Sequence, residues 1–282
     1  MNNVVVLTLI AVLMLSCVEN RSSKVHTSSV FTSGIEGPAT DNHGDLYVVN
    51  YKWQGTIGVI PVGEVEPEIF IVLPETSVGN GIRFLNDSIF FVADYVNHNI
   101  FRVNKHSKEI IVHASDSLMN QPNDIAITDD GVLYASDPNW SDETGQLWLI
   151  KSNGETVLLE NEMGTTNGVE VSPDGKNLYV NESVQGNVWK YDISPDGSVK
   201  NKILFHHFNE FGMDGMRCKK DGELYIARYG KGTIAVLSIH GELLHEIVLQ
   251  GPKPTNVTFS PAEDLLYITM QQRQWVEVIE LK

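Results

Sequence analysis

One sequence unit repeats six times along this 282-residue chain, and its period limits the folds open to the protein. Each copy contains a short apolar strand with an aromatic residue, and successive aromatic positions are 42 to 46 residues apart. These positions are Tyr47, Phe90, Tyr134, Tyr179, Tyr225 and Tyr267. Short strands that recur every 40 to 50 residues, roughly, are the signature of a β-propeller. Six copies therefore predict a six-bladed β-propeller.

Each copy also has the turn residues that a blade of antiparallel strands needs. Asp-Gly pairs at 130–131, 174–175 and 221–222 separate two apolar runs, which is a strong hairpin signal. Alternating segments after the aromatic strand supply a third strand, as at 99–103, and a fourth, as at 109–113. No segment of helical period longer than a turn or two competes, so the predicted fold class is all-β.

The sixth copy ends with its third strand, at 275–281, and is one strand short. An unused β-like stretch, Lys24–Ser29, lies where the fourth strand of a preceding blade would lie. We expect this N-terminal strand to complete the last blade, because pairing the two chain ends removes an open sheet edge. The propeller is thus predicted to occupy residues 24–282.

The N-terminal residues have the pattern of an export signal. Residues 4–16 form an apolar run that is shorter than the roughly 20 residues needed to span a bilayer. The run ends in Met-Leu-Ser-Cys, which resembles a bacterial lipobox with Cys17 as the lipidated residue. We expect a lipoprotein signal peptide at 1–17, a tether at 18–23, and an exported protein that is lipid-anchored in the bacterial cell envelope. Met14 and the lack of a preceding Lys or Arg leave ordinary cleavage or an uncleaved anchor as alternatives.

The formal net charge of −16 excludes some classes of partner. Nucleic acids and anionic lipid surfaces both require a basic face, so neither is expected as the main partner. Membrane contact is expected only through the N-terminal anchor. The predicted protein is a monomer that acts on a small molecule.

A side-chain oxygen donor stands ten to twelve residues ahead of each aromatic position. The donors are Glu36, Asn80, Asn123, Asn167, Asp214 and Asn256. The innermost strands of a propeller surround its channel, so equivalent positions at their starts converge at one mouth. Oxygen donors of this kind suit Ca²⁺, which takes about six to eight oxygen ligands. Mg²⁺ or Mn²⁺ with retained waters stay open, and Zn²⁺ is less favoured because no Cys or His stands at these positions.

A plainer interpretation of these donors is local. Asn and Asp favour turns because their side chains bond nearby backbone amides, and a Gly follows four of the six donors. For Asn80 and Asn256 this interpretation is as good as a ligand role. It is weaker for Glu36 and Asp214, because Glu is a poor turn-former and a buried carboxylate needs a compensating charge.

The second strand of each blade runs back toward the same mouth, and its end is predicted to form the rim of a pocket. The residues at these ends are Asn50, Asp94, Asp137, Glu182, Arg228 and Met270.

Four motifs occur in an order and spacing that resemble a known family. They are Glu36-Gly-Pro, Gln121-Pro-Asn-Asp124, Thr166-Asn-Gly168 with a following Ser-Pro-Asp-Gly-Lys, and Asp214-Gly-Met216. Together, over nearly all of 34–282, they resemble the gluconolactonase, senescence marker protein (regucalcin) and luciferin-regenerating enzyme family of six-bladed propellers. The resemblance implies hydrolysis of sugar lactones or related esters.

The resemblance also implies roles for single residues. Glu36, Asn167 and Asp214 would hold a divalent metal in the channel, Ca²⁺ first and Zn²⁺, Mg²⁺ or Mn²⁺ as alternatives, with Asn123 as a further ligand or a contact for substrate and water. Asp214 would be the base that activates water. The expected substrate contacts are Asn123, Gln121, Asn80, Glu182, Asp137 and Arg228.

One departure leaves the substrate open. Animal members of that family carry Arg where this chain has Gln121. The leading hypothesis is a metal-dependent lactonase or esterase. Its rival is a non-catalytic propeller that binds a ligand or a protein, with a purely structural Ca²⁺ ion. A propeller resembling strictosidine synthase is disfavoured, because the carboxylates and amides suit a metal site.

Overall fold

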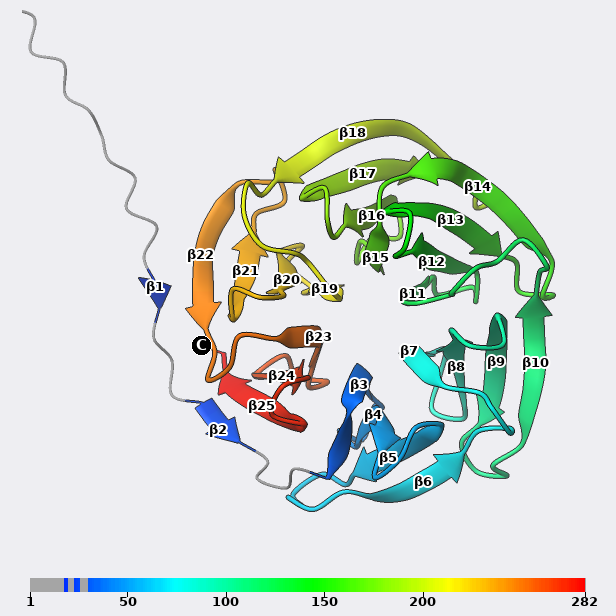
Figure 1. The fold of residues 1–282 in the computed structure, drawn as a ribbon, viewed down its shortest axis with the longest axis vertical. Helices are drawn as coiled ribbons and strands as arrows, with labels where there is room; N and C mark the ends of the chain where they lie inside the picture. Colours follow the sequence, from blue (N-terminus) through cyan, green and yellow to red (C-terminus); the bar gives the residue numbers. More distant parts are fainter. Residues whose placement is uncertain (1–17, 20–22, 26–29, 282) are drawn as a thin grey trace, which may run out of the picture.

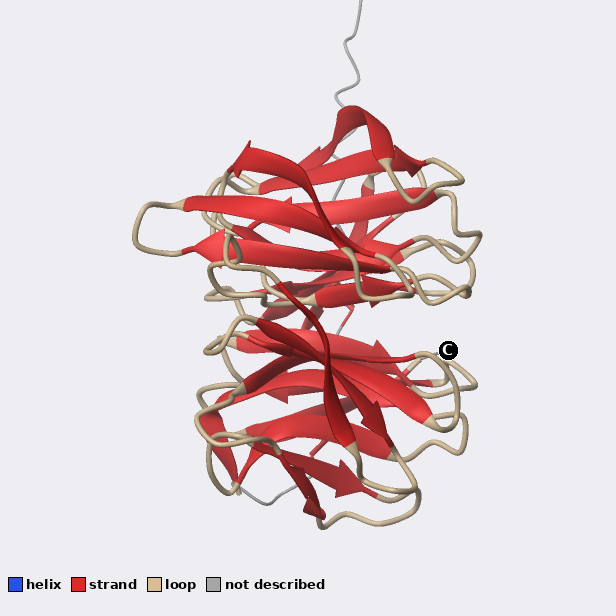
Figure 2. Ribbon diagram, turned by 90° about the vertical axis from the view of Figure 1, so that its right-hand side faces the viewer, coloured by secondary structure: helices blue, strands red, loops and turns tan. Residues whose placement is uncertain are grey.

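The computed structural model describes residues 18–19, 23–25 and 30–281, and these form six blades arranged in a ring around a central channel (Figure 1). Five sheets have four strands and one has five. In the side view, loops connect the strands at the two faces of the ring (Figure 2). Every regular element among the described residues is a strand. The prediction of an all-β six-bladed propeller is confirmed.

Within a blade, successive strands pair antiparallel from the channel outward. From blade 1 to blade 6 the consecutive strands are β3 (Phe31–Thr40), β4 (Leu46–Tyr51), β5 (Thr56–Ile60), β6 (Glu68–Val72); β7 (Gly79–Phe84), β8 (Ile89–Asp94), β9 (Asn99–Asn104), β10 (Ile110–Ser115); β11 (Ile125–Ile127), β12 (Leu133–Asn139), β13 (Thr144–Ile150), β14 (Thr156–Met163); β15 (Thr166–Val171), β16 (Asn177–Glu182), β17 (Asn187–Ile193), β18 (Val199–His207); β19 (Met216–Cys218), β20 (Leu224–Arg228), β21 (Thr233–Leu237), β22 (Leu243–Val248); β23 (Pro254–Phe259), β24 (Leu265–Met270) and β25 (Trp275–Glu280). The innermost strands β3, β7, β11, β15, β19 and β23 line the channel (Figure 1).

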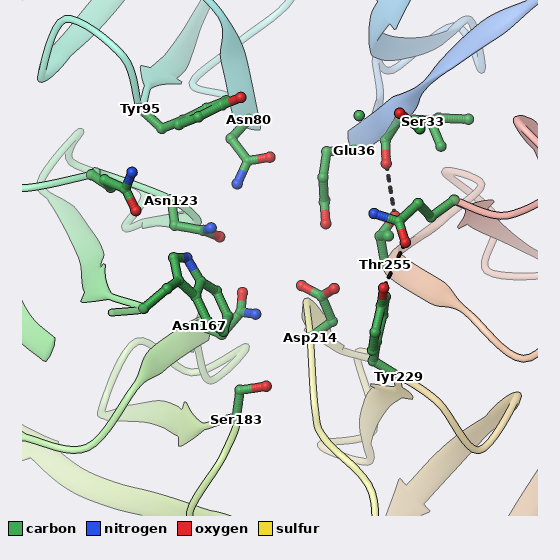
Figure 3. Close-up of a pocket in the computed structure, with 15 residues that line it drawn as sticks. Ser33, Glu36, Asn80, Tyr95, Asn123, Asn167, Ser183, Asp214, Tyr229 and Thr255 are labelled. Carbon is green, nitrogen blue, oxygen red and sulfur yellow. Dashed lines mark hydrogen bonds between the residues drawn. The ribbon is translucent and has the colours of Figure 1, made fainter. Parts of the chain in front are cut away.

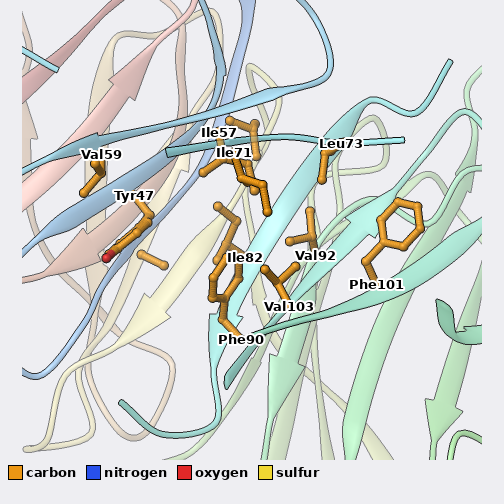
Figure 4. Close-up of a cluster of buried hydrophobic side chains, with 12 residues drawn as sticks. Tyr47, Ile57, Val59, Ile71, Leu73, Ile82, Phe90, Val92, Phe101 and Val103 are labelled. Carbon is orange, nitrogen blue, oxygen red and sulfur yellow. The ribbon is translucent and has the colours of Figure 1, made fainter. Parts of the chain in front are cut away.

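The repeated aromatic residues pack between neighbouring blades. Each lies in the second strand of its blade, and a buried apolar cluster fills the space between every pair of neighbours, including blades 6 and 1. Figure 4 shows the cluster between blades 1 and 2, where Tyr47 and Phe90 lie among Ile57, Ile82 and Val103. Full burial of one such side chain stabilises the fold by about 1.5–3 kcal/mol. The repeat therefore places one apolar cluster at each blade junction.

The two ends of the described chain meet in blade 6. Strand β2 (Ser23–Val25) pairs antiparallel with β25, with Lys24 opposite Val278. The predicted closing strand is confirmed, although it begins one residue earlier than expected, and residues 26–29 lie outside the described residues. Strand β1 (Val18–Glu19), within the predicted tether, pairs parallel with β22 in blade 5 (Figure 1). It accounts for the five-stranded sheet.

The predicted signal peptide at 1–17 lies outside the described residues. Lipidation of Cys17 therefore stays a prediction. Within the described ranges, the chain contains no helix with the length and apolar character needed to span a bilayer.

Removing residues 1–25 should destabilise the ring, because it deletes β1 and β2 and leaves β25 with an unpaired edge. A truncation of residues 1–17 alone is the control. We expect the longer truncation to melt at least about 5 °C lower than the control in differential scanning calorimetry. Equal melting temperatures would mean that the closing strand contributes no stability.

Candidate active site

A cavity of about 410 Å³ opens at one mouth of the channel. Residues from all six blades line it, and five of the six predicted oxygen donors are among them, namely Glu36, Asn80, Asn123, Asn167 and Asp214 (Figure 3). Glu36 and Asp214 lie on one side of the cavity, and the three amides point toward them from the other (Figure 3). The positions found by counting back from the aromatic residues therefore do converge.

The donors come from equivalent places in the fold. Glu36, Asn80 and Asn167 lie on β3, β7 and β15, whereas Asn123 and Asp214 stand just ahead of β11 and β19. Residues at the start of the innermost strand lie closest to the channel axis. This is why one residue per blade reaches the same cavity.

The glycines that follow four donors are required by close packing rather than by turns. A Cβ atom at Gly37 would lie 1.9 Å from the Asn80 carbonyl oxygen of the next blade, and one at Gly168 would lie 2.5 Å from the Asp214 carbonyl oxygen. A Cβ at Gly81 or Gly215 would likewise meet the side chain of the next blade's Asp124 or Asn256. The innermost strands approach so closely that a side chain does not fit between them.

Asn256 is the donor that does not line the cavity. Its Oδ1 accepts a hydrogen bond from the Val257 backbone N–H at 2.8 Å, and its side-chain amide lies near the Glu36 carboxylate and lowers the pKa of that group. Gly215 leaves room for this side chain, because a Cβ there would lie 1.9 Å from Asn256 Cγ. Asn256 therefore lies beside Glu36 instead of facing the cavity itself.

The pKa values of the two carboxylates in the cavity, Glu36 and Asp214, are both raised. Burial raises the pKa of Glu36 to about 7, and repulsion from Asp124 adds to the rise, although the Gly37 N–H opposes it by donating to the carboxylate at 2.9 Å. Burial, followed by repulsion from Glu36, raises the pKa of Asp214 well above its ordinary range. When both carboxylates are ionised they repel each other, and a positive charge between them would stabilise the pair.

An unsatisfied amide oxygen completes this arrangement. Asn167 is 3% exposed and lowers the pKa of the neighbouring Asp214, but its Oδ1 atom has no hydrogen-bond partner in the described structure. A buried acceptor without a donor is costly. A cation between Asn167, Asp214 and Glu36 would satisfy it and neutralise the two carboxylates, so these residues fit a bound metal.

The character of the donors favours a hard cation. Among residues 18–19, 23–25 and 30–281, no three side chains of the types His, Cys, Asp and Glu come together in a group that could hold a metal ion. The cavity has two carboxylates, and its other side-chain oxygens belong to amides and hydroxyls. Carboxylate and amide oxygens are ligands that Ca²⁺ prefers.

A buried charged layer crosses the channel beyond the donors, and sequence reasoning missed it. Arg83 bonds Asp124 at 3.2 Å and Glu170 at 3.2 Å, and Arg217 lies 3.6 Å from Glu170 and donates to the Pro38 carbonyl at 3.2 Å. These contacts connect blades 1 to 5. A signal was present, because Arg83, Glu170 and Arg217 each follow a donor by three residues within an innermost strand.

The predicted rim residues Asp137, Glu182 and Arg228 do not line the cavity. Each instead binds backbone of the loop that enters its own blade. Asp137 accepts from the Asn120 N–H at 2.9 Å, Glu182 accepts from the Gly164 N–H at 2.8 Å, and Arg228 donates to the Glu210 carbonyl. Their expected place as substrate contacts is thus corrected to a place behind the cavity wall.

The error has a simple geometric cause. Side chains alternate between the two faces of a strand, so a shift of one residue moves a position to the other face. The residues immediately after the expected ring do line the cavity in four blades, namely Tyr95, Ser183, Tyr229 and Gln271. The aromatic Trp140 joins them from the turn between β12 and β13.

The predicted contacts Asn80, Gln121 and Asn123 do line the cavity. The backbone N–H of Gln121 donates to the Asp137 carboxylate, so Asp137 fixes the position of this residue. Tyr229 and Gln271 bond each other at 2.6 Å (Figure 3). The cavity therefore presents amides at its centre and aromatic rings near its mouth.

A closed ring with converging oxygen donors defines a propeller with a candidate cation site at one mouth. The family model of the SMP-30/Gluconolactonase/LRE-like region matches residues 35–272, and the chain belongs to this family. The resemblance seen in the four motifs is confirmed.

Two relatives match most of the chain. The diisopropyl-fluorophosphatase of Loligo vulgaris is 25% identical over 278 residues, which cover 86% of this chain and 87% of that protein. The gluconolactonase of Zymomonas mobilis is 25% identical over 270 residues, which cover 83% and 75%. Among solved structures, a calcium-binding regucalcin from Agrobacterium tumefaciens has a TM-score of 0.82 at 19% identity, covering 94% and 95% of the chains. That likeness shows the fold alone.

The raised pKa of Glu36 predicts how stability depends on pH without a cation. Its ordinary value of 4.5 applies to the unfolded chain and about 7 to the folded one, so the folded state binds more protons between these values. The free energy of unfolding therefore falls as pH rises through this window. We expect the chelator-treated protein to melt about 5 °C lower at pH 7.5 than at pH 5. Added Ca²⁺ should raise the melting temperature more at pH 7.5 than at pH 5.

Glu36→Gln is the control for this effect. The variant cannot ionise at this position, so its chelator-treated form should melt higher at pH 7.5 than the chelator-treated wild type and should respond little to Ca²⁺. Identical pH profiles for the two proteins would contradict the assignment.

Gly215→Ala should displace the Asn256 side chain from Glu36, because the new Cβ has no room. Overpacking of this kind costs about 1–3 kcal/mol. We expect a lower melting temperature and weaker Ca²⁺ binding by calorimetry. Gly251→Ala is the matched control, because its Cβ would meet the flexible side chains of Met270 at 3.2 Å and Arg273 at 3.3 Å and no backbone. If both variants melt alike, close packing at Gly215 is not what holds Asn256.

Proposed function

We propose that this protein hydrolyses lactones or related esters with the help of a divalent cation at the channel mouth, with Ca²⁺ as the first candidate. The observation that carries the proposal is the meeting of Glu36, Asp214 and the unpartnered Asn167 Oδ1 in one cavity. The relatives support the reaction class, because a gluconolactonase matches most of the chain.

Glu36, Asn167 and Asp214 would hold the cation, with Asn123 as a further oxygen donor or as a contact for substrate and water. A bound divalent cation polarises an ester carbonyl and stabilises the negative charge that develops on its oxygen. The neighbouring Asn256 amide would favour the ionised form of Glu36, because it lowers the pKa of that carboxyl.

Asp214 is proposed as the general base. Its carboxylate accepts a proton from the water that attacks the carbonyl carbon, and the proton passes to the ring oxygen as the C–O bond breaks. One lactone and one water thus give one hydroxy acid.

The amides on the opposite side of the cavity are proposed to orient the substrate. Asn80, Gln121 and Asn123 each offer a donor and an acceptor to hydroxyl or carbonyl groups. We further propose that the reaction takes place outside the cytoplasmic membrane, on a lipid-anchored protein. That part of the proposal rests on the apolar run at 4–16 and on Cys17.

Asp214→Asn should lower cation-dependent lactone hydrolysis by about a hundredfold or more, because it removes the proton acceptor. The measurement is a lactone panel with a pH indicator, with Ca²⁺ and with a chelator. Calcium binding to the same variant, measured by calorimetry, separates loss of the base from loss of the ion. Asp129→Asn is the control, an exposed aspartate in the turn between β11 and β12.

Equal activity of Asp214→Asn and wild type would refute the assigned base. The rival function, a binding propeller with a structural ion, predicts a different pattern. Chelation would then lower the melting temperature, while no lactone, aryl ester or organophosphate would be turned over.

A further inference from the structure

A second cavity of about 450 Å³ lies beside the first, along the junction of blades 4 and 5. We call it the side groove, and its apolar lining is Trp140, Val184, Phe208, Phe211 and Tyr229. Trp140, Val184 and Phe211 are 44%, 52% and 51% exposed. Large apolar side chains gathered at a concave surface mark a binding site rather than ordinary surface.

The side groove continues from the cavity that holds the oxygen donors. Trp140, Ser183 and Tyr229 line both. In the close-up, Tyr229 is drawn on the same side of the cavity as Asp214, and Ser183 lies below Asn167 (Figure 3); the Ser183 hydroxyl donates to the carbonyl of Met213, which precedes Asp214 in the chain. A molecule with its reacting carbonyl near Asp214 could therefore extend a substituent past these residues into the side groove.

Backbone hydrogen bonds fix the wall of the side groove. The Gly212 N–H donates to the Tyr229 carbonyl at 3.1 Å, and the Asp214 N–H donates to the Ala227 carbonyl at 2.9 Å. The Ser183 hydroxyl donates to the Met213 carbonyl. The segment between β18 and β19 is thus attached to β20 and to the end of β16, so the groove is formed before any ligand enters.

The backbone at Phe211 is held in an unfavourable conformation. Its φ of 59° lies in the left-handed region, which a bulky side chain seldom occupies. This conformation leaves the ring half-exposed at the groove, and Arg228 supports the wall from below by stacking its guanidinium 3.6 Å from the Phe208 ring centroid.

The charge of both cavities limits what they can bind. Among the described residues that line the main cavity, none is Lys, Arg or His, whereas Glu36 and Asp214 are acidic. The side groove adds Glu210, with His207 as its basic group. A cation bound at the donors would neutralise Glu36 and Asp214, so the repulsion that an anionic substituent meets in the side groove comes from Glu210, while an uncharged apolar substituent would cover exposed rings.

We propose that the side groove is a subsite for the apolar alkyl or aryl substituent of an uncharged lactone or ester. The inference rests on the proposed function for the position of the reacting carbonyl. It makes a specific claim about selectivity, namely that substrates with an apolar tail are preferred over polyhydroxylated lactones of similar size.

The test uses the full chain with Ca²⁺ and a series of γ-lactones whose alkyl substituent grows from methyl to octyl. We expect kcat/KM to rise by up to about fourfold per methylene until the side groove is filled. A substituent of equal length that ends in a carboxylate should lose this gain. Phe211→Ser and Val184→Ser should each reduce the gain in kcat/KM per methylene. Val96→Ser should retain the wild-type slope, because Val96 is 41% exposed at the equivalent turn of blade 2, outside both cavities.

A binding measurement separates this inference from the proposed function. The matching 5-alkyl-pyrrolidinones are lactams that resist hydrolysis, and their affinity can be measured by calorimetry. Lactam affinity that rises with alkyl length and loses the rise in Phe211→Ser supports the subsite, even if no lactone is turned over. Affinity independent of alkyl length, or equal slopes for Val184→Ser and Val96→Ser, overturns the subsite even if lactones are hydrolysed.

Discussion

Two carboxylates held near each other in the channel of a closed ring are the constraint on which this structure depends. Glu36 comes from blade 1 and Asp214 from blade 5, so no local segment brings them together. Burial raises the pKa of both, and the Gly37 N–H and the neighbouring Asn167 and Asn256 side chains oppose the rise. Two ionised carboxylates this close repel each other. They stay close because Glu36 lies in β3 and Asp214 stands just ahead of β19, two innermost strands that the rest of their blades hold in place.

The ring withstands that repulsion because it is closed and well packed. An apolar cluster fills every junction between blades, and β2 pairs the two ends of the described chain. The charged layer of Arg83, Asp124, Glu170 and Arg217 connects blades across the channel. Glycines after the donors let the innermost strands approach to backbone contact. The close packing of the innermost strands therefore positions the donors around the cavity. The cavity volume of about 410 Å³ leaves room for a substrate beside them.

The candidate site was predictable in its centre and not at its edge. Counting back from the aromatic residues found Glu36, Asn80, Asn123, Asn167 and Asp214, because a strict repeat places equivalent residues at equivalent depths. The same count at the other strand ends selected Asp137, Glu182 and Arg228, none of which lines the cavity, whereas Ser183 and Tyr229, one residue after the last two, do. Neighbouring side chains on a strand point to opposite faces, so an offset of one residue selects a side chain that points away from the cavity. The turn residues Trp140 and Phe211 have no periodic signal, because the loops that carry them differ among blades.

The amino-acid sequence alone predicts the class of fold, the number of blades, the strand that closes the ring and the side chains that converge in the channel. It can do so because period and alternation are properties of the chain itself. Three further features become visible only in the folded ring: Asn256 lies near Glu36, Asn167 Oδ1 lacks a partner, and Arg83 meets Glu170 from another blade. These outcomes depend on distances between segments far apart in sequence. Such distances are set by the packing of whole blades around the channel, which no local pattern records.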